Sequence, residues 1–409
     1  MESDDMVFVF ILGLIFVACL FLEKKLKEYL VRCGLFLVEF PIVDRKIVSK
    51  FETFDRYLGW SPKETENHPD NTGSYLGFNR RSTFYSIDRN GSRTFRNYFE
   101  KCYISTFGDS FAMCRQVNDD ETFQYFLSQK TKSFVANYGV GGYGLDQALL
   151  RLESLELPIE TRYICMFVTP WTVERMLACW KHYIEPGNIL GAKPRFICDN
   201  GELKLIENFV RCKDDFKNLK TYRDFLHKND GNFPFFSRKL KHSPKTALGY
   251  LFSRKDLLNY LLAFYRFKNL KNLTFERFLQ KGEAFIVNNL QEECEYLQEL
   301  YRKHFALLEA VLKRFVNFCK NKTWTPFFVM LPSFFHIKFM LTGNDLYRNE
   351  INSICKKNNL SYLDMFDFWN TLEESELEKC FVDIYGHHSA IGNQYVSEII
   401  YEKFFASNF

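Results

Sequence analysis

The sequence predicts an α/β fold in which a three-layer α/β/α domain with a parallel sheet carries a large, mostly helical insertion and an N-terminal membrane helix. Two observations predict the layers. Short apolar runs of strand length alternate with helical patterns in residues 98–175, and the alternation returns in residues 324–409. The third observation is the unbroken apolar run Met6–Leu22, which predicts the membrane helix.

Five segments follow from these patterns. We expect a membrane anchor with a basic flank in 1–32, a mixed segment in 33–97, the first part of the core in 98–175, a helical insertion in 176–323 and the second part of the core in 324–409. Expected strands lie at 82–87, 103–107, 133–137, 163–168, 327–331 and 360–363, and expected helices at 120–130, 145–155, 349–357 and 390–405. Within the insertion, apolar residues recur at three- and four-residue steps in 283–319, which predicts a long helix.

The N-terminal run has the charge pattern of an uncleaved single-pass anchor. Acidic residues precede Met6, whereas Lys24, Lys25 and Lys27 follow Leu22. A secretory signal peptide has a positive start, so the acidic start argues against cleavage. The positive-inside rule places the bulk of the chain on the cytoplasmic side. A buried N-terminal helix is the alternative.

Composition excludes several classes of protein. The net charge of +4 does not indicate wholesale nucleic-acid binding. The 12 cysteines contain no CxxC pair, so a zinc ribbon is absent, and we expect most of them to be buried and reduced. Residues 211–255 hold 12 Lys and Arg against 4 Asp and Glu. Three interpretations of this basic window stay open: it is simply a solvated helical surface, it binds an anionic membrane, or it binds an acidic glycan.

The first motif that could carry chemistry is Gly108-Asp109-Ser110, directly after an expected strand. A serine at such a turn presents its hydroxyl at the edge of the sheet where open α/β folds bind ligands. A helix beginning there would supply backbone N–H groups for developing negative charge. Because Asp and Ser are also common helix caps, a purely structural role stays open.

The second motif is the glycine cluster that follows Asn137. Gly139, Gly141 and Gly144 fit the GxGxxG pattern of a dinucleotide site. That site also needs an acidic residue at the end of the next strand, and the chain has none after 163–168. A glycine loop equally suits a backbone N–H that approaches an oxyanion.

The third motif lies just before the last expected helix. Asp383 stands four residues before His387, and His388 follows. A histidine with a carboxylate nearby can act as a general base with its orienting partner. Two alternatives remain: ordinary loop histidines beside a capping Ser389, and a metal site.

Taken together, the three motifs resemble those of the SGNH/GDSL hydrolase family, over residues 98–175 and 324–409. The resemblance implies a flavodoxin-like sheet with Ser110 as the nucleophile, His387 as the base and Asp383 as its partner, His388 being the alternative base. It also implies an oxyanion hole with Gly142, counted from Asn137. The family's third block offers an asparagine as a further donor. Here the chain reads Thr169-Pro170-Trp171-Thr172, so Thr172 is expected to fill that position.

The function that this resemblance implies is hydrolysis of acyl esters by a membrane-anchored serine enzyme. Its substrate would be an acylated glycan or a lipid. No metal or organic cofactor is needed for this chemistry. Because the asparagine donor is missing, a non-catalytic or acyl-transferring protein on the same fold is the alternative.

Overall fold

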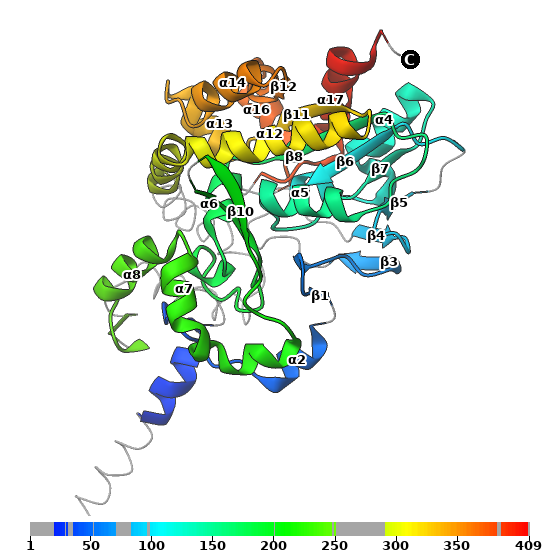
Figure 1. Ribbon diagram of the computed structural model, residues 1–409. Helices are drawn as coiled ribbons and strands as arrows, with labels where there is room; N and C mark the ends of the chain where they lie inside the picture. Colours follow the sequence, from blue (N-terminus) through cyan, green and yellow to red (C-terminus); the bar gives the residue numbers. More distant parts are fainter. Residues whose placement is uncertain are drawn as a thin grey trace, which may run out of the picture. The chain divides into compact units, whose positions relative to one another are not determined.

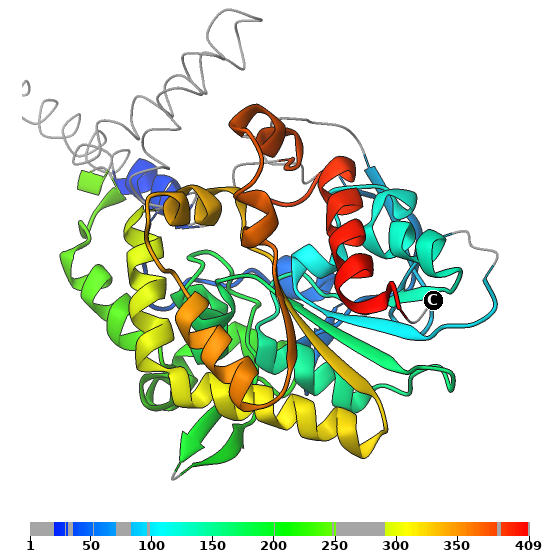
Figure 2. The ribbon, with the colours of Figure 1, turned by 90° about the horizontal axis from the view of Figure 1, so that it is seen from above.

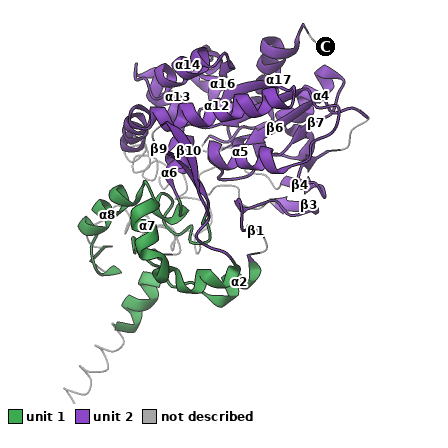
Figure 3. Cartoon of the chain, in the orientation of Figure 1, with its two compact units in different colours: residues 1–50, 179–192, 212–286 green, residues 51–178, 193–211, 287–409 purple. Residues whose placement is uncertain are grey.

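A computed structural model describes residues 20–28, 30–31, 36–51, 53–70, 83–95, 99–199, 201–247, 249–250, 291–382 and 386–407. The chain forms two compact units (Figure 3). Unit 1 contains residues 1–50, 179–192 and 212–286, and unit 2 contains residues 51–178, 193–211 and 287–409. Each unit is therefore built from segments that are distant in the sequence.

Unit 2 is a mixed α/β structure built on an eight-stranded sheet (Figure 1). Its strands β6 and β8 are almost completely buried, as expected for central strands covered on both faces. The strand order is β12-β11-β8-β6-β7-β5-β4-β3. The strands span Thr65–Asp70 (β3), Thr83–Ile87 (β4), Arg93–Thr94 (β5), Ile104–Gly108 (β6), Val135–Asn137 (β7), Tyr163–Val168 (β8), Thr325–Met330 (β11) and Ser361–Asp364 (β12).

Five neighbouring strands of this sheet run parallel. Numbered in chain order among themselves, they have the spatial order 2-1-3-4-5, which is a doubly wound arrangement. The chain leaves β6 toward β7 on one side and later returns to β8 on the other. The carboxyl end of β6 therefore lies at a topological switch point, where such sheets bind ligands.

The sheet extends beyond the expected parallel strands at one edge. Strands β3, β4 and β5 add to the sheet in antiparallel fashion. Strands β4 and β5 are joined by a short turn in which Asp88 Oδ1 accepts from the N–H groups of Asn90 and Ser92, and Gly91 has a φ of +74°. A turn this short can only reverse the chain, because a parallel crossover needs a dozen or more residues.

Helices cover both faces of the sheet (Figure 2). On one face α4 (Phe123–Thr131) packs against α17 (Ala390–Ile400), drawn in red. On the other face α12 packs against α5 and α14. These three span Phe305–Asn321 (α12), Leu145–Ser154 (α5) and Arg348–Lys357 (α14). Unit 2 therefore has three layers, with the sheet in the middle.

Shorter elements complete unit 2. The helices are Ser110–Met113 (α3), Thr172–Leu177 (α6), Phe334–Leu341 (α13), Phe366–Trp369 (α15) and Glu374–Lys379 (α16), with a 3₁₀ turn at Asp119–Glu121 and a π-helical turn at Tyr401–Phe405. Residues 291–303 are also helical. Two small antiparallel pairs are Phe54–Asp55 (β1) with Gly59–Trp60 (β2), and Arg195–Asp199 (β9) with Glu202–Ile206 (β10).

The span 176–323 is less uniformly helical than expected. It contains the β9–β10 hairpin, whose turn includes Gly201 with a φ of +84°. The alternation of apolar and polar residues in 202–206 indicates a strand with one exposed face. Unit 1 takes part of the same span, namely the helices Arg223–Asn229 (α7) and Phe233–His242 (α8) and the 3₁₀ segments Lys181–Tyr183 and Lys213–Tyr222. It also contains α2 (Arg45–Lys50).

The predicted membrane segment Met6–Leu22 lies outside the described residues except for its last three positions. Among the helices that the structure does describe, none combines the length and the apolar character needed to cross a membrane.

Candidate functional site

Ser110 is the first residue of the short helix α3, directly after the fully buried strand β6. Asp109 caps this helix, because its Oδ1 accepts from the N–H of Phe111 at 2.9 Å. The capping role that the sequence allowed for Asp109 is therefore real. It leaves the side chain of Ser110 partly exposed at the carboxyl end of β6.

Gly108 is required by the close approach of β6 to β8. Its φ is +150°, and a Cβ at this position would lie 2.0 Å from the carbonyl oxygen of Phe167. Any side chain would separate the two central strands. The glycine of the first motif therefore sets the path of the chain into Ser110.

His387 meets Ser110 from the far end of the sequence. Its Nε2 lies 3.1 Å from Ser110 Oγ, which is hydrogen-bond distance. The ring also packs 4.8 Å from the ring of Phe111. An imidazole nitrogen in this position can accept the hydroxyl proton, as the activation of a serine nucleophile requires.

Backbone contacts on both sides hold the His387 loop. The N–H of Val382 donates to the carbonyl of His387 at 2.8 Å, and the N–H of Ser389 donates to the carbonyl of Cys380 at 2.8 Å. Ser389 then caps α17 through the N–H of Gly392. Asp383, the expected partner of His387, lies outside the described residues.

His388 is not placed to serve as an alternative base. It is 4% exposed and packs against the rings of Phe111, Trp369 and Phe381. Neither ring nitrogen has a hydrogen-bond partner among the described residues. Burial, with a smaller contribution from His387, lowers the pKa of His388 to about 3. Its ring is therefore neutral and part of an aromatic cluster, which also removes it as a metal ligand.

The glycine loop after β7 packs directly on α3. A Cβ on Gly139 would lie 2.4 Å from the backbone nitrogen of Met113, and the N–H of Val140 donates to the carbonyl of Gly108 at 3.0 Å. The next two residues form a turn in which Gly142 has a φ of +78°. The N–H groups of Ser110 and Gly141 donate to no acceptor in the described parts of the chain. A Cβ on Gly141 would meet no atom within 4 Å.

Thr172 does not occupy an oxyanion-donor position, and this expectation needs correction. The residue is fully buried, and its Oγ1 accepts from the N–H of Leu145 at 2.7 Å. Its hydroxyl thus caps the start of α5. The carboxylate of Asp146 is buried at the same helix end and pairs with Lys193 at 2.6 Å. A dinucleotide pyrophosphate would need this helix end, so the GxGxxG alternative is disfavoured.

Behind Ser110 lies a buried hydrogen-bond network that was not predicted from the sequence. Asp109 Oδ2 accepts from Thr169 Oγ1 at 2.8 Å and from Arg175 Nη1 at 2.9 Å. Asp109 is 1% exposed, so its charge needs such partners. The Arg175 guanidinium also lies over the Trp171 ring. The third block of the motif set therefore positions the residue before Ser110. The sequence held one indication of this network. Asp109 directly follows a strand that was expected to be buried, so a buried cation such as Arg175 could have been expected beside it.

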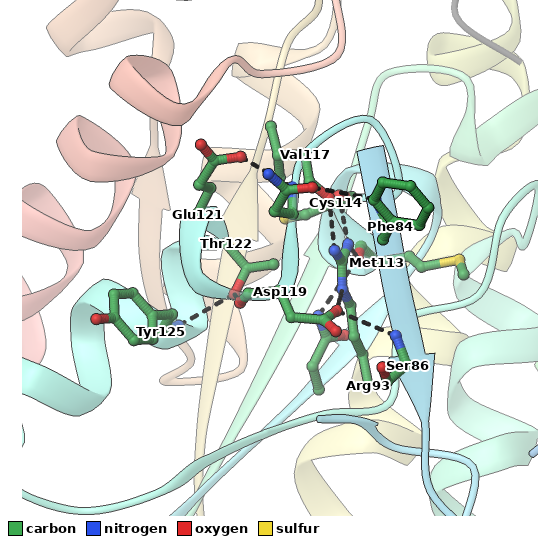
Figure 4. Close-up of polar contacts among 12 residues, drawn as sticks. Phe84, Ser86, Arg93, Met113, Cys114, Val117, Asp119, Glu121, Thr122 and Tyr125 are labelled. Carbon is green, nitrogen blue, oxygen red and sulfur yellow. Dashed lines mark hydrogen bonds and ion pairs between the residues drawn. The ribbon is translucent and has the colours of Figure 1, made fainter. Parts of the chain in front are cut away.

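Arg93 holds the loop that follows α3 (Figure 4). This buried side chain, from β5, donates to Asp119 Oδ1 at 2.8 Å and to the carbonyl oxygens of Met113, Cys114 and Val117. Cys114 ends α3 in a left-handed conformation, with a φ of 55°. The guanidinium thus satisfies carbonyl groups that the four-residue helix leaves free.

A second Ser–His pair lies at the carboxyl end of β11. Ser333 Oγ is 2.8 Å from His336 Nδ1, and both residues are fully buried. Gly386, next to His387, packs on Ser333, since a Cβ there would lie 2.7 Å from Ser333 Cα. A substrate cannot reach a fully buried hydroxyl, so this pair is a helix-capping contact.

No group of three or more His, Cys, Asp or Glu side chains that could hold a metal ion occurs in the ranges that the structure describes. Of the ten cysteines in those ranges, eight are buried and none forms a disulfide. The burial of these eight agrees with the expectation.

No protein-family model matches the chain, and no curated protein matches it. Several solved structures are similar to it, among them the two that follow. One, a "putative lipolytic protein of G-D-S-L family" from Desulfitobacterium hafniense DCB-2, has 11% identity and a TM-score of 0.33, covering 74% of this chain and 99% of its own. Another has 10% identity and a TM-score of 0.37, covering 76% of this chain and 99% of its own. The function of this chain is therefore argued from its own geometry.

Proposed function

We propose that the chain is a serine ester hydrolase of the SGNH/GDSL kind, with Ser110 as the nucleophile and His387 as the general base. The observation that carries the proposal is the 3.1 Å contact between Ser110 Oγ and His387 Nε2. Its place supports the same conclusion, because Ser110 lies at the switch point of a sheet with the order 2-1-3-4-5.

In the proposed reaction, Ser110 Oγ attacks the acyl carbonyl carbon while its proton passes to His387 Nε2. The tetrahedral intermediate collapses as His387 returns the proton to the leaving alcohol, which gives an acyl-serine. Water then attacks the acyl group, with His387 as base, and releases the acid. A sugar or lipid hydroxyl in place of water would make the enzyme an acyl transferase.

The oxyanion of the intermediate would be held by backbone N–H groups. The Ser110 N–H is one donor, because it has no acceptor within the described chain and belongs to the residue that forms the new bond. The glycine turn supplies the other donor. Resemblance favours Gly142 for this role. The free N–H of Gly141 and the open space at its Cα favour Gly141.

Asp383 remains the proposed partner of His387 Nδ1. A carboxylate there would fix the imidazole tautomer and stabilise the imidazolium. Replacing Asp383 with Asn is expected to lower kcat by about 10⁴-fold if the residue has this role.

The proposed substrate is an acyl ester. The ring of Phe111 packs on that of His387, but Phe111 is 2% exposed, so it supports the histidine and does not face a substrate. The support for this substrate class is the Ser110–His387 pair itself, because a serine hydroxyl that gives its proton to a histidine attacks the carbonyl of an acyl group. An O-acylated glycan and a lipid both present such a group. Release of acetate from acetylated polysaccharide, compared with release of long acyl chains from lipid esters, distinguishes them.

One observation favours a non-catalytic protein as the second candidate. The segment after β8 has no asparagine or glutamine that could donate a side-chain amide to the oxyanion. Three other polar side chains of this segment are engaged elsewhere, since Thr169 and Arg175 bind Asp109 and Thr172 caps α5. Loss of one oxyanion donor costs roughly 10²–10³ in rate. The chain would then bind an ester without turning it over.

Hydrolysis of short p-nitrophenyl esters tests the proposal. Ser110→Ala and His387→Ala are each expected to lower kcat by roughly 10⁴-fold or more, and the double variant is expected to lose no more than either alone, because the two residues act as a unit. Ser154→Ala, a serine at the end of α5, is the matched control. Turnover by Ser110→Ala at the control rate would contradict the proposal.

A further inference from the structure

A helix in unit 1 presents three consecutive large apolar residues to solvent. Residues 20–28 are helical, and Leu20, Phe21 and Leu22 are 54%, 61% and 65% exposed. Single exposed apolar residues are normal on a protein surface, but an adjacent group of this size indicates an interaction site. Two exposed cations, Lys24 and Lys25, follow directly.

This helix is held within unit 1 by its other residues. Leu26 and Leu30 belong to an apolar cluster with Phe36, Ala247 and Tyr250. The carboxylate of Glu23 accepts from the N–H of Ala247, and Lys27 Nζ donates to the carbonyl of Lys245 at 3.5 Å. The exposed apolar end is therefore attached to the segment that follows α8.

Helix α8 adds a set of cations that lack acidic partners. Its buried side carries Phe236, which packs on the rings of His182 and Tyr183. Arg238, Lys239 and Lys241 of the same helix are exposed. No carboxylate among the described residues forms an ion pair with these three cations or with the exposed Lys245.

We propose that unit 1 binds the surface of a membrane containing anionic lipids. The lipid-binding surface consists of Leu20–Leu22, Lys24, Lys25, the α8 cations (Arg238, Lys239 and Lys241) and Lys245. The apolar residues enter the region of the acyl chains, whereas the cations contact lipid headgroups. Charge complementarity and the adjacent apolar residues together favour a membrane over an acidic glycan, which offers no apolar phase. The proposal does not depend on hydrolase activity.

Flotation of the full chain with vesicles tests this surface. Wild-type protein is expected to prefer vesicles with phosphatidylserine over vesicles of phosphatidylcholine alone, and the preference is expected to fall as salt rises. In the variant Arg238→Gln/Lys239→Gln/Lys241→Gln, the apparent affinity for phosphatidylserine vesicles should fall on the order of 10²-fold, at roughly fivefold for each cation. The variant Leu20→Ser/Phe21→Ser/Leu22→Ser should bind both kinds of vesicle more weakly.

The matched control removes three exposed cations from unit 2, as Lys320→Gln/Lys322→Gln/Lys356→Gln. It should keep the wild-type preference. Equal loss in the control and in the α8 variant, or no preference for phosphatidylserine in the wild type, would overturn the proposal. So would an α8 variant that loses binding to a soluble acidic polysaccharide yet keeps wild-type vesicle binding, because the occupant would then be a glycan.

Discussion

Arg175 Nη1 donates to Asp109 Oδ2 across 2.9 Å, and both side chains are almost completely buried. Asp109 is the residue before Ser110 and caps the helix that Ser110 begins. The ion pair thus connects α6, after one central strand, to the helix that presents the proposed nucleophile. In this account Arg175 is a positioning residue, acting through Asp109.

Removing one partner of this ion pair should strongly reduce the stability of the fold. Arg175→Met leaves the buried carboxylate of Asp109 without its cation, so we expect the free energy of unfolding to fall by about 3 to 5 kcal/mol. Chemical denaturation measures this change. The double variant Asp109→Asn/Arg175→Met removes both charges and keeps a side chain that can cap α3. It should be more stable than Arg175→Met alone, and additive losses would contradict the coupling.

Replacement by alanine should strongly reduce stability at Gly108 and leave it nearly unchanged at Gly141. Gly108→Ala places a methyl group 2.0 Å from the carbonyl oxygen of Phe167 at a φ of +150°, so the protein should be severely destabilised or fail to fold. Gly141→Ala meets no atom within 4 Å and should change stability by no more than about 0.5 kcal/mol. Thermal unfolding distinguishes the two, and equal melting temperatures would contradict the described packing.

Replacing Arg93 with Lys tests the hydrogen bonds that the Arg93 guanidinium makes to the loop after α3. Lysine keeps the positive charge but cannot donate to four acceptors in the planar geometry of a guanidinium. We expect a loss of about 2 to 4 kcal/mol in the free energy of unfolding and lower esterase kcat, since the end of α3 loses its support. Arg89→Lys, at the turn between β4 and β5, is the control and should leave both quantities unchanged.

His388 should make the protein less stable in acid. Burial lowers its folded-state pKa from 6.5 to about 3. Between these values the unfolded chain binds a proton that the folded chain does not, so the free energy of unfolding rises with pH from about 3 to 6.5 and is then constant. The slope amounts to about 1.4 kcal/mol per pH unit for this one group.

In His388→Leu, the slope of the free energy of unfolding against pH should fall by the amount that corresponds to one bound proton. Denaturation curves at several pH values between 4 and 7 provide the measurement. His242→Leu is the control, since this histidine is exposed and lies in unit 1. An unchanged slope in His388→Leu would mean that the ring is not held neutral in the folded protein.

The sequence predicted the parallel core of the fold because its strands are continuous apolar runs. The run Tyr163–Val168 coincides with β8, and the expected helix at 145–155 differs from α5 by one residue. At the antiparallel edge the expected strand at 82–87 corresponds to β4, whereas β5 was missed because it has only two residues, too few for a periodic signal. The hairpin Arg195–Ile206 was missed because its strands are short and lie among helical patterns.

Two candidate site residues could be chosen because their residue types are tied to local motifs, and their catalytic roles remain predictions. Ser110 follows an expected strand, and His387 precedes the last expected helix. The structure places the two side chains within hydrogen-bond distance of each other. The network of Asp109 with Thr169 and Arg175 could not be predicted, since burial of a carboxylate depends on packing between distant segments. Thr172 was assigned wrongly because a hydroxyl that caps a helix and one that faces a ligand look the same in sequence.

The most direct test of the central claim is labelling of the full chain with a fluorophosphonate probe, followed by mapping of the labelled peptide. Within the described part of the chain, two serines lie within hydrogen-bond distance of a histidine, Ser110 at 3.1 Å and the buried Ser333 at 2.8 Å. We expect one label on Ser110, lost in Ser110→Ala and in His387→Ala, and none on Ser333. A folded protein that takes up no label, or takes it up equally without His387, would contradict it.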